Sequence, residues 1–215
     1  MTRQNASTIA RQYLARGDGK GWFEQVYRTA NGNSEHVPWA DLRPHPLLVD
    51  WLAGLRFGPV EALDVGCGLG DNAEALADAG MNVTAFDLSP TATRWARQRF
   101  AGSQVKYQSA DLFSAPGLWR QKFDLVSEIY TLQSLPKSMR PRAIRAIAGF
   151  IKPGGTLLVI CRGREENKTA AGPPWPLAKS EIMTFTGHGF TLQCFDVFEA
   201  YDNGPWPRFR FVFKR

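Results

Sequence analysis

The sequence predicts an α/β fold, in which a doubly wound, mostly parallel, seven-stranded sheet ends in an antiparallel pair of strands. Three observations lead to this prediction. Short apolar runs alternate with helical segments from residue 60 onward, a glycine-rich turn follows the first run, and no helix separates the last two runs. The chain has 215 residues, of which 44% are apolar, and this is the size and composition of one globular domain.

The first 55 residues are polar, aromatic and rich in loops, and we expect them to form a helical cap within that single domain. Helices are expected over residues 5–16 and 22–27, and apolar residues at helical spacing predict another over 47–55. We therefore divide the chain into a cap, residues 1–55, and a main part, residues 56–215.

The main part begins with five runs that we expect to form parallel strands. They cover residues 60–65, 82–86, 105–108, 123–127 and 156–161, with helices expected over 71–79, 90–100 and 141–150. Pro90 favours the start of its helix, because the missing N–H costs nothing in a first helical turn. Parallel strands need crossover connections, so the intervening helices should cover both faces of the sheet.

The end of the chain has a different pattern. A helix is expected over residues 177–186, and strands over 190–198 and 208–213. The link between these strands contains Asp202, Asn203, Gly204 and Pro205 and is too short for a parallel crossover. The two strands should therefore run antiparallel, paired directly or through a loop.

Charge and cysteine content exclude several classes of protein. The net charge of +6 is modest, and the arginines at 94, 97 and 99 and at 140, 142 and 145 are interpreted as solvated helix faces. Three widely spaced cysteines, Cys67, Cys161 and Cys194, indicate no disulfide framework and no metal site. The sequence lacks an apolar run of ~20 residues and an N-terminal signal core, so we expect a cytoplasmic protein without a membrane segment.

The clearest motif is a glycine-rich turn between the first strand and its helix, Ala62-Leu-Asp-Val-Gly-Cys-Gly-Leu-Gly70. Glycines there allow a sharp turn and let a ligand lie against main-chain atoms. Asp87 ends the second strand, where an acid can accept hydrogen bonds from both hydroxyls of a ribose. Asp111 follows the third strand, where it can accept from an exocyclic amine while Leu112 packs on a ring. The three strand ends together predict a nucleoside site.

Two further acids indicate the charge of the group attached to the nucleoside. Asp64 precedes the first glycine of the turn and Asp71 follows the last. Both would repel a pyrophosphate, and they suit a ligand with an ammonium or sulfonium cation.

These motifs resemble the signatures of class I S-adenosylmethionine-dependent methyltransferases. Leu63-Asp-Val-Gly-Cys-Gly-Leu-Gly70 is similar to the first signature, Phe86-Asp87-Leu88-Ser89 to the ribose-binding second, and Ala110-Asp111-Leu112 to the adenine-contacting third. Residues 123–128 and 152–155 resemble the fourth strand and the turn before the fifth. The resemblance covers residues 60–215, and it implies a Rossmann-like fold with S-adenosylmethionine as cofactor and S-adenosylhomocysteine as product.

The resemblance also implies roles for individual residues. Asp64, Gly66 and Gly68 would line the methionine moiety, and Glu128, Ile129 and Tyr130 would border the donor methyl. The full set of expected cofactor-binding residues is Trp22, Asp64, Gly66, Cys67, Gly68, Asn72, Asp87, Leu88, Ser89, Asp111, Leu112, Glu128 and Ile129.

The N-terminal aromatic residues indicate which branch of the family the sequence resembles. Trp22-Phe-Glu-Gln-Val-Tyr27 and Val37-Pro-Trp-Ala-Asp41 resemble the lid of small-molecule methyltransferases near the thiopurine, thiol and halide enzymes, although Ala40 interrupts the Pro-Trp-Asp order. Residues 172–177, together with Arg162, resemble a substrate-side loop of that branch. The residues that this resemblance brings to the reaction are Tyr27, Trp39, Tyr130 and Arg162.

The sequence thus predicts a monomeric enzyme that transfers a methyl group to a small, possibly heteroaromatic, thiol by in-line displacement. Arg162 could raise the thiolate fraction, and His36 and His45 are candidates for a general base. One alternative is O- or N-methylation of a small aromatic metabolite. Others are a nucleic-acid methyltransferase or a donor-binding protein without turnover. Residues 127–130 lack the Asn/Asp-Pro-Pro-aromatic motif of nucleobase amino methylases, which counts against a nucleic-acid substrate.

Overall fold

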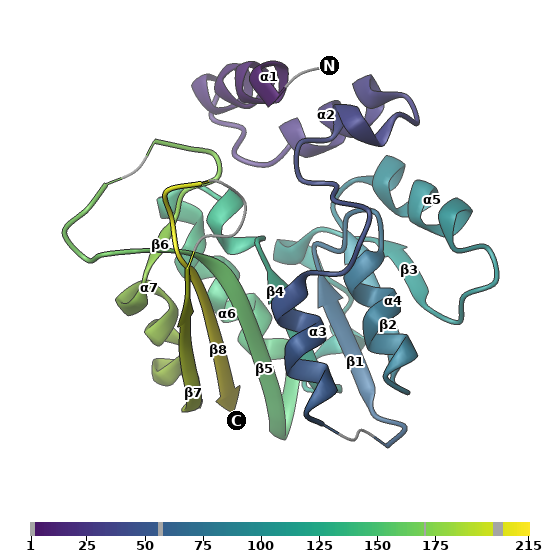
Figure 1. The fold of residues 1–215 in the computed structure, drawn as a ribbon, viewed down its shortest axis with the longest axis vertical. Helices are drawn as coiled ribbons and strands as arrows, with labels where there is room; N and C mark the ends of the chain where they lie inside the picture. Colours follow the sequence, from purple (N-terminus) through teal and green to yellow (C-terminus); the bar gives the residue numbers. More distant parts are fainter. Residues whose placement is uncertain (1–2, 56–57, 170, 200–203) are drawn as a thin grey trace. The chain divides into compact units, whose positions relative to one another are not determined.

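A computed structural model describes residues 3–55, 58–169, 171–199 and 204–215 (Figure 1). It confirms the predicted α/β fold, with mostly parallel strands followed by antiparallel strands at the C-terminal end. The chain forms two compact units, Met1–Ser114 and Ala115–Arg215. The boundary between these units follows Ser114, whereas we predict from the sequence a division between cap and main part after residue 55.

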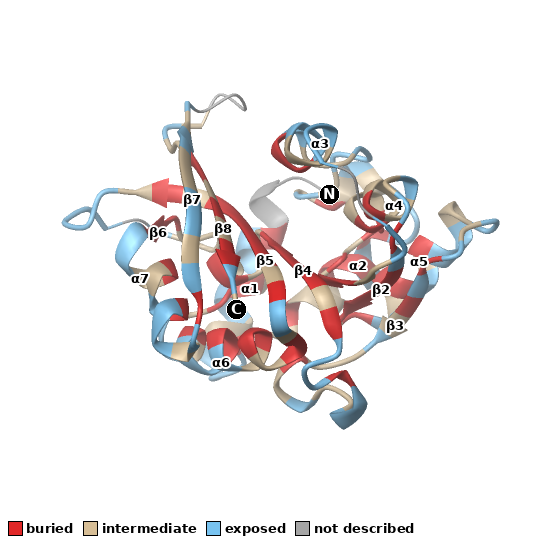
Figure 2. Cartoon of the chain, turned by 90° about the horizontal axis from the view of Figure 1, so that it is seen from below, coloured by how far each residue is buried: buried red, intermediate tan, exposed pale blue. Residues whose placement is uncertain are grey.

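The first unit consists of parallel strands with helices before and between them. Its elements are α1 (Arg3–Ala15), α2 (Trp22–Ala30), α3 (Pro46–Ala53), β1 (Glu61–Val65), α4 (Asp71–Asp78), β2 (Asn82–Asp87), α5 (Pro90–Arg99) and β3 (Lys106–Ser109), with short 3-10 turns at Ser34–His36 and Leu112–Ser114. The strands lie in the order β3-β2-β1, with Leu63 opposite Thr84 and Phe86 opposite Gln108. β1 and β2 are buried over nearly their whole length, which is typical of parallel strands covered on both faces (Figure 2).

Side-chain caps explain where two helices of this unit begin. Ser89 precedes α5, and its hydroxyl accepts a hydrogen bond from the Ala92 amide at 2.9 Å. His45 precedes α3, and its Nδ1 accepts from the Leu47 amide at 3.2 Å. The end of α2 differs from the prediction, because the helix continues to Ala30 and stops at Asn31, whose φ of 47° is left-handed.

The second unit holds the antiparallel end of the fold. Its elements are β4 (Phe123–Ile129), α6 (Arg140–Phe150), β5 (Ile151–Arg164), β6 (Leu177–Ala178), α7 (Lys179–Met183), β7 (Thr191–Phe198) and β8 (Arg208–Lys214), with 3-10 turns at Gly117–Trp119, Leu132–Ser134, Lys137–Met139 and Thr184–His188. β4 and β5 run parallel, and β5, β8 and β7 lie side by side as antiparallel neighbours (Figure 1). The direct antiparallel pairing of the last two strands is thereby confirmed. Asp202 and Asn203 of their predicted link lie outside the described residues.

Two elements of this unit depart from the prediction. β5 begins at Ile151, five residues before the predicted start, and runs through the Pro153-Gly154-Gly155 turn region. The helix predicted over residues 177–186 is instead the short strand β6, a five-residue helix and a 3-10 turn. The local pattern is overridden because Leu177 pairs with Gly163 and Ala178 with Arg164 on β5.

Aromatic side chains form much of the core of the second unit. Phe209, Phe211 and Phe213 alternate along β8 and are buried, and Phe195 of β7 packs on Phe211 with ring centroids 4.5 Å apart. β7 is the edge strand of this unit, and its residues are half-buried or exposed (Figure 2). Within the described ranges, no helix combines the length and the apolar character that crossing a membrane requires.

Candidate functional site

The glycine-rich turn after β1 has the backbone geometry that only glycine adopts without strain. Gly66, Gly68 and Gly70 have φ angles of 68°, 53° and 95°. A Cβ on Gly68 would lie 3.0 Å from the Tyr27 hydroxyl, and a Cβ on Gly70 would collide with the Tyr107 hydroxyl. Two tyrosines therefore pack so closely on this turn that larger residues are excluded from it.

Asp87 connects the glycine-rich turn to the end of β2. Its Oδ2 accepts from the Gly68 amide at 3.0 Å, and its Oδ1 accepts from the Ser89 amide at 2.8 Å. Burial raises the pKa of this carboxyl from its ordinary 3.8 to about 6, the two amide bonds act in the opposite direction, and the charge of Glu24 raises it further. Each carboxylate oxygen has two acceptor sites, so these two bonds leave acceptor capacity for a ligand.

Asp111 is bound by Lys20, which is not among the predicted site residues. Its Oδ2 forms an ion pair with Lys20 Nζ, and its Oδ1 accepts from the Phe113 amide at 3.0 Å. The same ammonium lies 5.4 Å from the centre of the Phe113 ring. Lys20 stands in a Gly-Asp-Gly-Lys-Gly loop, and nothing in that local sequence indicates a partner at the end of β3.

We predict from the sequence that Asp71 offers its negative charge to a cationic ligand. In the structure this charge is already paired within the protein. Arg99 binds both oxygens of Asp71, at 2.7 and 2.8 Å, and also donates to the Leu69 carbonyl at 2.6 Å. Arg97 donates to the Tyr107 carbonyl at 2.5 Å. Arg97 and Arg99 thus bind within the protein, whereas Arg94 is exposed, as a solvated helix face predicts.

The predicted aromatic cap is present on α2 and the loop that follows it. Trp39 Nε1 donates to the buried Tyr27 hydroxyl at 2.8 Å, and the Trp39 ring meets the rings of Trp22, Phe23 and Tyr27 edge-on. Tyr27 and Leu69 of the glycine-rich turn belong to the same buried apolar cluster. Trp22 Nε1 is buried and has no hydrogen-bond partner among the described residues.

Glu24, which lies within the aromatic segment, attaches α2 to the start of α5. Its Oε2 accepts from the Ser89 hydroxyl at 2.5 Å and from the Thr91 amide at 3.2 Å, and its Oε1 accepts from the Thr91 hydroxyl at 2.7 Å. A carboxylate at a helix N-terminus is also favoured by the helix dipole. Glu24 was not among the predicted site residues.

Several predicted cofactor residues have partners inside the first unit. The Ser89 hydroxyl caps α5 and donates to Glu24, and Asn72 Oδ1 accepts from the His45 amide at 2.8 Å. Burial raises the pKa of the Cys67 thiol well above its ordinary value, so this cysteine stays protonated at neutral pH. Leu112 is buried, and Leu88 is half-buried.

In the second unit, Glu128 and Tyr130 form the turn at the end of β4. Glu128 is fully buried, and its Oε1 accepts from the amides of Thr131 and Leu132 at 2.7 and 2.8 Å. Tyr130 has a φ of 67°, an uncommon backbone conformation for a residue with a side chain. Ile129 between them is buried.

Two arginines lie near the Tyr130 ring. Arg208 Nε donates to the Tyr130 hydroxyl at 2.7 Å, and the guanidinium carbons of Arg162 and Arg208 lie 5.9 and 6.0 Å from the ring centre. Gln133 Oε1 accepts from the Arg162 amide at 2.6 Å, and the Gln133 carbonyl accepts from the Trp175 amide at 2.7 Å. The structure thus brings Tyr130 and Arg162 together, and it adds Arg208 and Gln133, which were not among the predicted residues.

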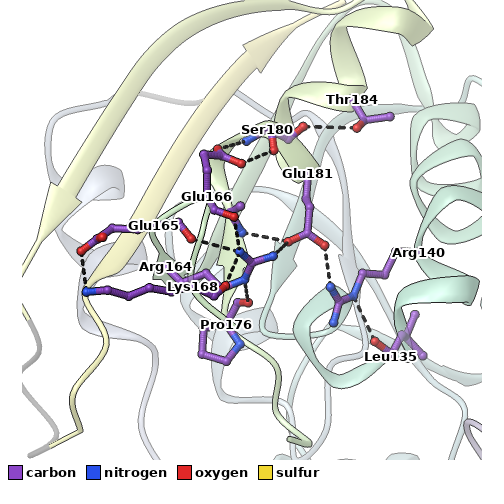
Figure 3. A network of polar contacts seen from close by, with 11 residues as sticks. Leu135, Arg140, Arg164, Glu165, Glu166, Lys168, Pro176, Ser180, Glu181 and Thr184 are labelled. Atoms are coloured by element: carbon purple, nitrogen blue, oxygen red, sulfur yellow. Dashed lines mark hydrogen bonds and ion pairs between the residues drawn. The ribbon is translucent and has the colours of Figure 1, made fainter. Parts of the chain in front are cut away.

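The loop that resembles a substrate-side segment is held by a carboxylate between two arginines (Figure 3). Glu181 binds Arg140 through Oε1 at 2.6 Å and Arg164 through Oε2 at 2.7 Å. Arg164 in turn donates to main-chain carbonyls along the loop, at Glu165, Glu166, Lys168 and Pro176. Arg140 is therefore buried in a network, and it is not the solvated residue that its spacing predicts.

Comparison with known proteins identifies the family of this chain. Residues 62–155 match a family model described as a methyltransferase domain. A ubiquinone biosynthesis O-methyltransferase of Thiobacillus denitrificans is 37% identical over 79% of this chain and 68% of its own length. This chain is a member of the S-adenosylmethionine-dependent methyltransferases.

Other relatives of this methyltransferase extend the comparison. The ubiquinone biosynthesis O-methyltransferase of Dechloromonas aromatica is 31% identical over 66% of the chain and 60% of its own length. The chain spans only 51–60% of the first relatives of this kind. A solved 1,6-didemethyltoxoflavin-N1-methyltransferase of Burkholderia thailandensis, with S-adenosylhomocysteine bound, has a TM-score of 0.71 over 90% of this chain and 87% of its own. Because the identity is 17%, this likeness shows the fold alone.

The first unit of the methyltransferase fits an adenosine-bearing sulfonium. Asp87 is buried at the end of β2 and keeps acceptor capacity on both oxygens, as a ribose diol requires. Trp22 Nε1 is a buried donor in the aromatic cap without a hydrogen-bond partner among the described residues. Asp64, the acid before the first glycine of the turn, is 1% exposed.

Replacing Glu24 by alanine should destabilise the methyltransferase by about 1–2 kcal/mol, because three hydrogen bonds to one carboxylate and its interaction with the α5 dipole are lost. Urea unfolding followed by circular dichroism measures this change in the free energy of unfolding. Glu35→Ala, at an exposed position on the same N-terminal segment, is the control and should change stability by less than about 0.5 kcal/mol. Equal effects of the two substitutions would contradict the assigned contacts.

Replacing Glu181 by glutamine should destabilise the methyltransferase by about 2–3 kcal/mol, since two largely buried guanidinium groups lose their shared counter-charge. Glu165→Gln is a matched control in the same network, because its ion pair with Lys168 is more than half exposed (Figure 3). That substitution should cost less than about 1 kcal/mol. Thermal unfolding of both variants tests the difference, and a Glu181→Gln variant as stable as Glu165→Gln would refute it.

Proposed function

We propose that this methyltransferase transfers the methyl group of S-adenosylmethionine to a hydroxyl oxygen of a small aromatic acceptor. The observation that carries the donor half of the proposal is the buried Asp87, bound to the glycine-rich turn and to the start of α5. The acceptor half is supported by the relatives named above, which are O-methyltransferases of ubiquinone biosynthesis. The thiol acceptor that we predict from the sequence has no support in those names.

On the donor side, we assign residues of the first unit to the parts of the cofactor. Asp87 accepts hydrogen bonds from the ribose hydroxyls, and Asp64 with the glycine-rich turn faces the methionine portion. Asp111 accepts from the adenine amine, which then shares this carboxylate with Lys20. Tyr27, which accepts a hydrogen bond from Trp39, packs on the same turn and keeps water from it.

On the acceptor side, the main task of the protein is to align the acceptor oxygen with the donor methyl group. When bound, the cofactor would supply a methyl group on a positive sulfur. The acceptor oxygen would bond to that carbon as the sulfur–carbon bond breaks, which would leave S-adenosylhomocysteine, and the hydroxyl proton would pass to solvent. Tyr130, Arg162 and Arg208 provide an aromatic face with positive charge, which favours the phenolate form of an acceptor. His45 is a poor candidate for the base, because its Nδ1 already accepts from the Leu47 amide.

The proposal is tested by following transfer of an isotopically labelled methyl group to matched phenols, anilines and aromatic thiols. We expect a labelled methyl ether from the phenol and slower transfer to the other two. Product identification by mass spectrometry and NMR assigns the methylated atom. Faster transfer to the thiol would restore the acceptor that we predict from the sequence, and transfer to none would refute the proposed activity.

The affinity for S-adenosylhomocysteine should fall as the pH is lowered through about 6, because the ionised Asp87 is the better acceptor for ribose hydroxyls. The decrease approaches tenfold per pH unit below the pKa. For stability, the raised pKa means that the folded chain holds this proton up to a higher pH than the unfolded chain. The contribution of Asp87 to the free energy of unfolding therefore decreases as the pH rises from about 4 to 6.

Calorimetric titration from pH 5 to 8 measures this dependence. Asp87→Asn, which lacks the titrating group, should bind weakly with little change over the same range. Equal affinity of the unmodified protein at pH 5 and pH 8 would remove Asp87 from the ribose site.

A further inference from the structure

The helix α2 contacts both of the residues whose main-chain amides hold Asp87. These amides belong to Gly68 of the glycine-rich turn and to Ser89 at the start of α5. The Tyr27 hydroxyl lies against Gly68, since a Cβ there would be 3.0 Å from it. Glu24 precedes Tyr27 by one helical turn and accepts from the Ser89 hydroxyl at 2.5 Å. Residues one turn apart share a helix face, so a single face of α2 reaches both supports of the Asp87 carboxylate.

Glu24 fixes Ser89 as part of a larger set of hydrogen bonds. Its carboxylate also accepts from the Thr91 hydroxyl at 2.7 Å and from the Thr91 amide at 3.2 Å. The Ser89 hydroxyl gives its proton to Glu24 and accepts from the Ala92 amide at 2.9 Å. The fully buried residue whose amide holds Asp87 is therefore bound to α2 on one side and to the first turn of α5 on the other.

Glu24 also brings a negative charge close to Asp87. Burial is the largest cause of the raised pKa of the Asp87 carboxyl, the two amide bonds act in the opposite direction, and the Glu24 charge raises it further. Two other titratable groups interact with this carboxyl, namely the Tyr27 hydroxyl of α2 and the Cys67 thiol of the turn. Burial raises the pKa of each well above its ordinary value, so both stay neutral between about pH 5 and 8.

Other charged residues lie on the elements around Asp87. On α5, Arg97 donates to the Tyr107 carbonyl, and Arg99 binds both oxygens of an aspartate at the start of α4. The charge of Asp64, near the end of β1, acts on the thiol in the glycine-rich turn. The nearby charge that acts on the Asp87 carboxyl is that of Glu24.

We propose that Glu24 is a positioning residue of the cofactor site, which through Ser89 fixes Asp87 in the orientation that the ribose requires. The helix α2 is thereby part of this site through a side chain that acts by way of another residue. The inference rests on the proposed function, because it concerns how the ribose of the cofactor is held. Since a like charge disfavours the ionised form of Asp87, removal of the Glu24 charge should also change how binding depends on pH.

The test measures the affinity of the full chain and of Glu24→Gln for S-adenosylhomocysteine by calorimetric titration at pH 5, 6, 7 and 8. The glutamine keeps the length of the side chain and one acceptor oxygen but removes the charge. At pH 8, where Asp87 is ionised in both proteins, we expect the variant to bind about 3- to 10-fold more weakly, because Ser89 is held less firmly. At pH 5 the difference should shrink or reverse, because Asp87 without a charged neighbour stays ionised to a lower pH.

Two further variants separate the charge from the contacts. Thr91→Val removes one hydroxyl that Glu24 binds and leaves both the charge and the contact with Ser89, so it should lower the thermal stability without moving the pH profile. Glu24→Asp keeps the charge on a shorter side chain, so it should bind more weakly at pH 8 with the pH profile of the unmodified protein. Thermal unfolding verifies that each variant is folded.

The outcomes distinguish the positioning role from the proposed function. A Glu24→Gln variant that binds as tightly as the unmodified protein at pH 8 would overturn the positioning role. A loss of the same size at every pH would also overturn it, because a merely structural contact predicts that result. Failure of the unmodified protein to bind S-adenosylhomocysteine at any of these pH values would instead refute the proposed function.

Discussion

Replacing Asp87 by asparagine is expected to weaken the binding of S-adenosylhomocysteine by about 10- to 100-fold. The asparagine side chain loses the charge that strengthens hydrogen bonds from ribose hydroxyls, a loss of about 1.5–3 kcal/mol. Its NH₂ group would also face one of the two amides, of Gly68 or Ser89, that donate to the carboxylate. The turn and the start of α5 would then lose part of their shared connection. Calorimetric titration with S-adenosylhomocysteine measures the change in affinity.

Asp78→Asn is the matched control for Asp87→Asn. Asp78 is exposed at the end of α4, so this variant removes the same charge without touching the turn. We expect its affinity for S-adenosylhomocysteine to stay within about twofold of the unmodified protein. If Asp87→Asn also stayed within that range, the ribose would have to be held by other residues.

Replacing Gly70 by alanine is expected to destabilise the first unit by about 2–5 kcal/mol. The φ of 95° costs a residue with a side chain about 1–2 kcal/mol. The added methyl group would also collide with the Tyr107 hydroxyl, which is held by Glu74 and packs on this turn. Displacing a well-packed side chain costs about a further 1–3 kcal/mol. Urea unfolding of the variant measures the total.

Two other glycines separate the contributions. Gly32 has a similar φ of 82° with open space around its Cα, so Gly32→Ala should show the backbone cost alone. Gly102 has open space and no left-handed conformation, so Gly102→Ala should be close to neutral. A Gly70→Ala variant no less stable than Gly32→Ala would mean that Tyr107 moves aside without cost.

The donor side of the candidate site could be predicted from the sequence because its parts are local. Gly66, Gly68 and Gly70 are needed for a turn within five residues, and Asp87 ends a short strand of mostly apolar residues. By contrast, the engagement of Asp111 by Lys20 and of Asp71 by Arg99 joins segments with no common pattern. In the sequence, Lys20 and Arg99 are indistinguishable from ordinary surface residues. Only the folded structure shows that each of them forms an ion pair with one of these acids.

The sequence by itself determined the alternation of strands and helices, the glycine-rich turn and the acids at the strand ends, because each depends on neighbouring residues and their backbone preferences. Only the tertiary structure decided that Arg162 faces Arg208 across two antiparallel strands and that Glu181 joins Arg140 to Arg164. Strand register and loop packing bring together side chains that are far apart in the chain. The repulsion or attraction between such charges arises only after the backbone has folded.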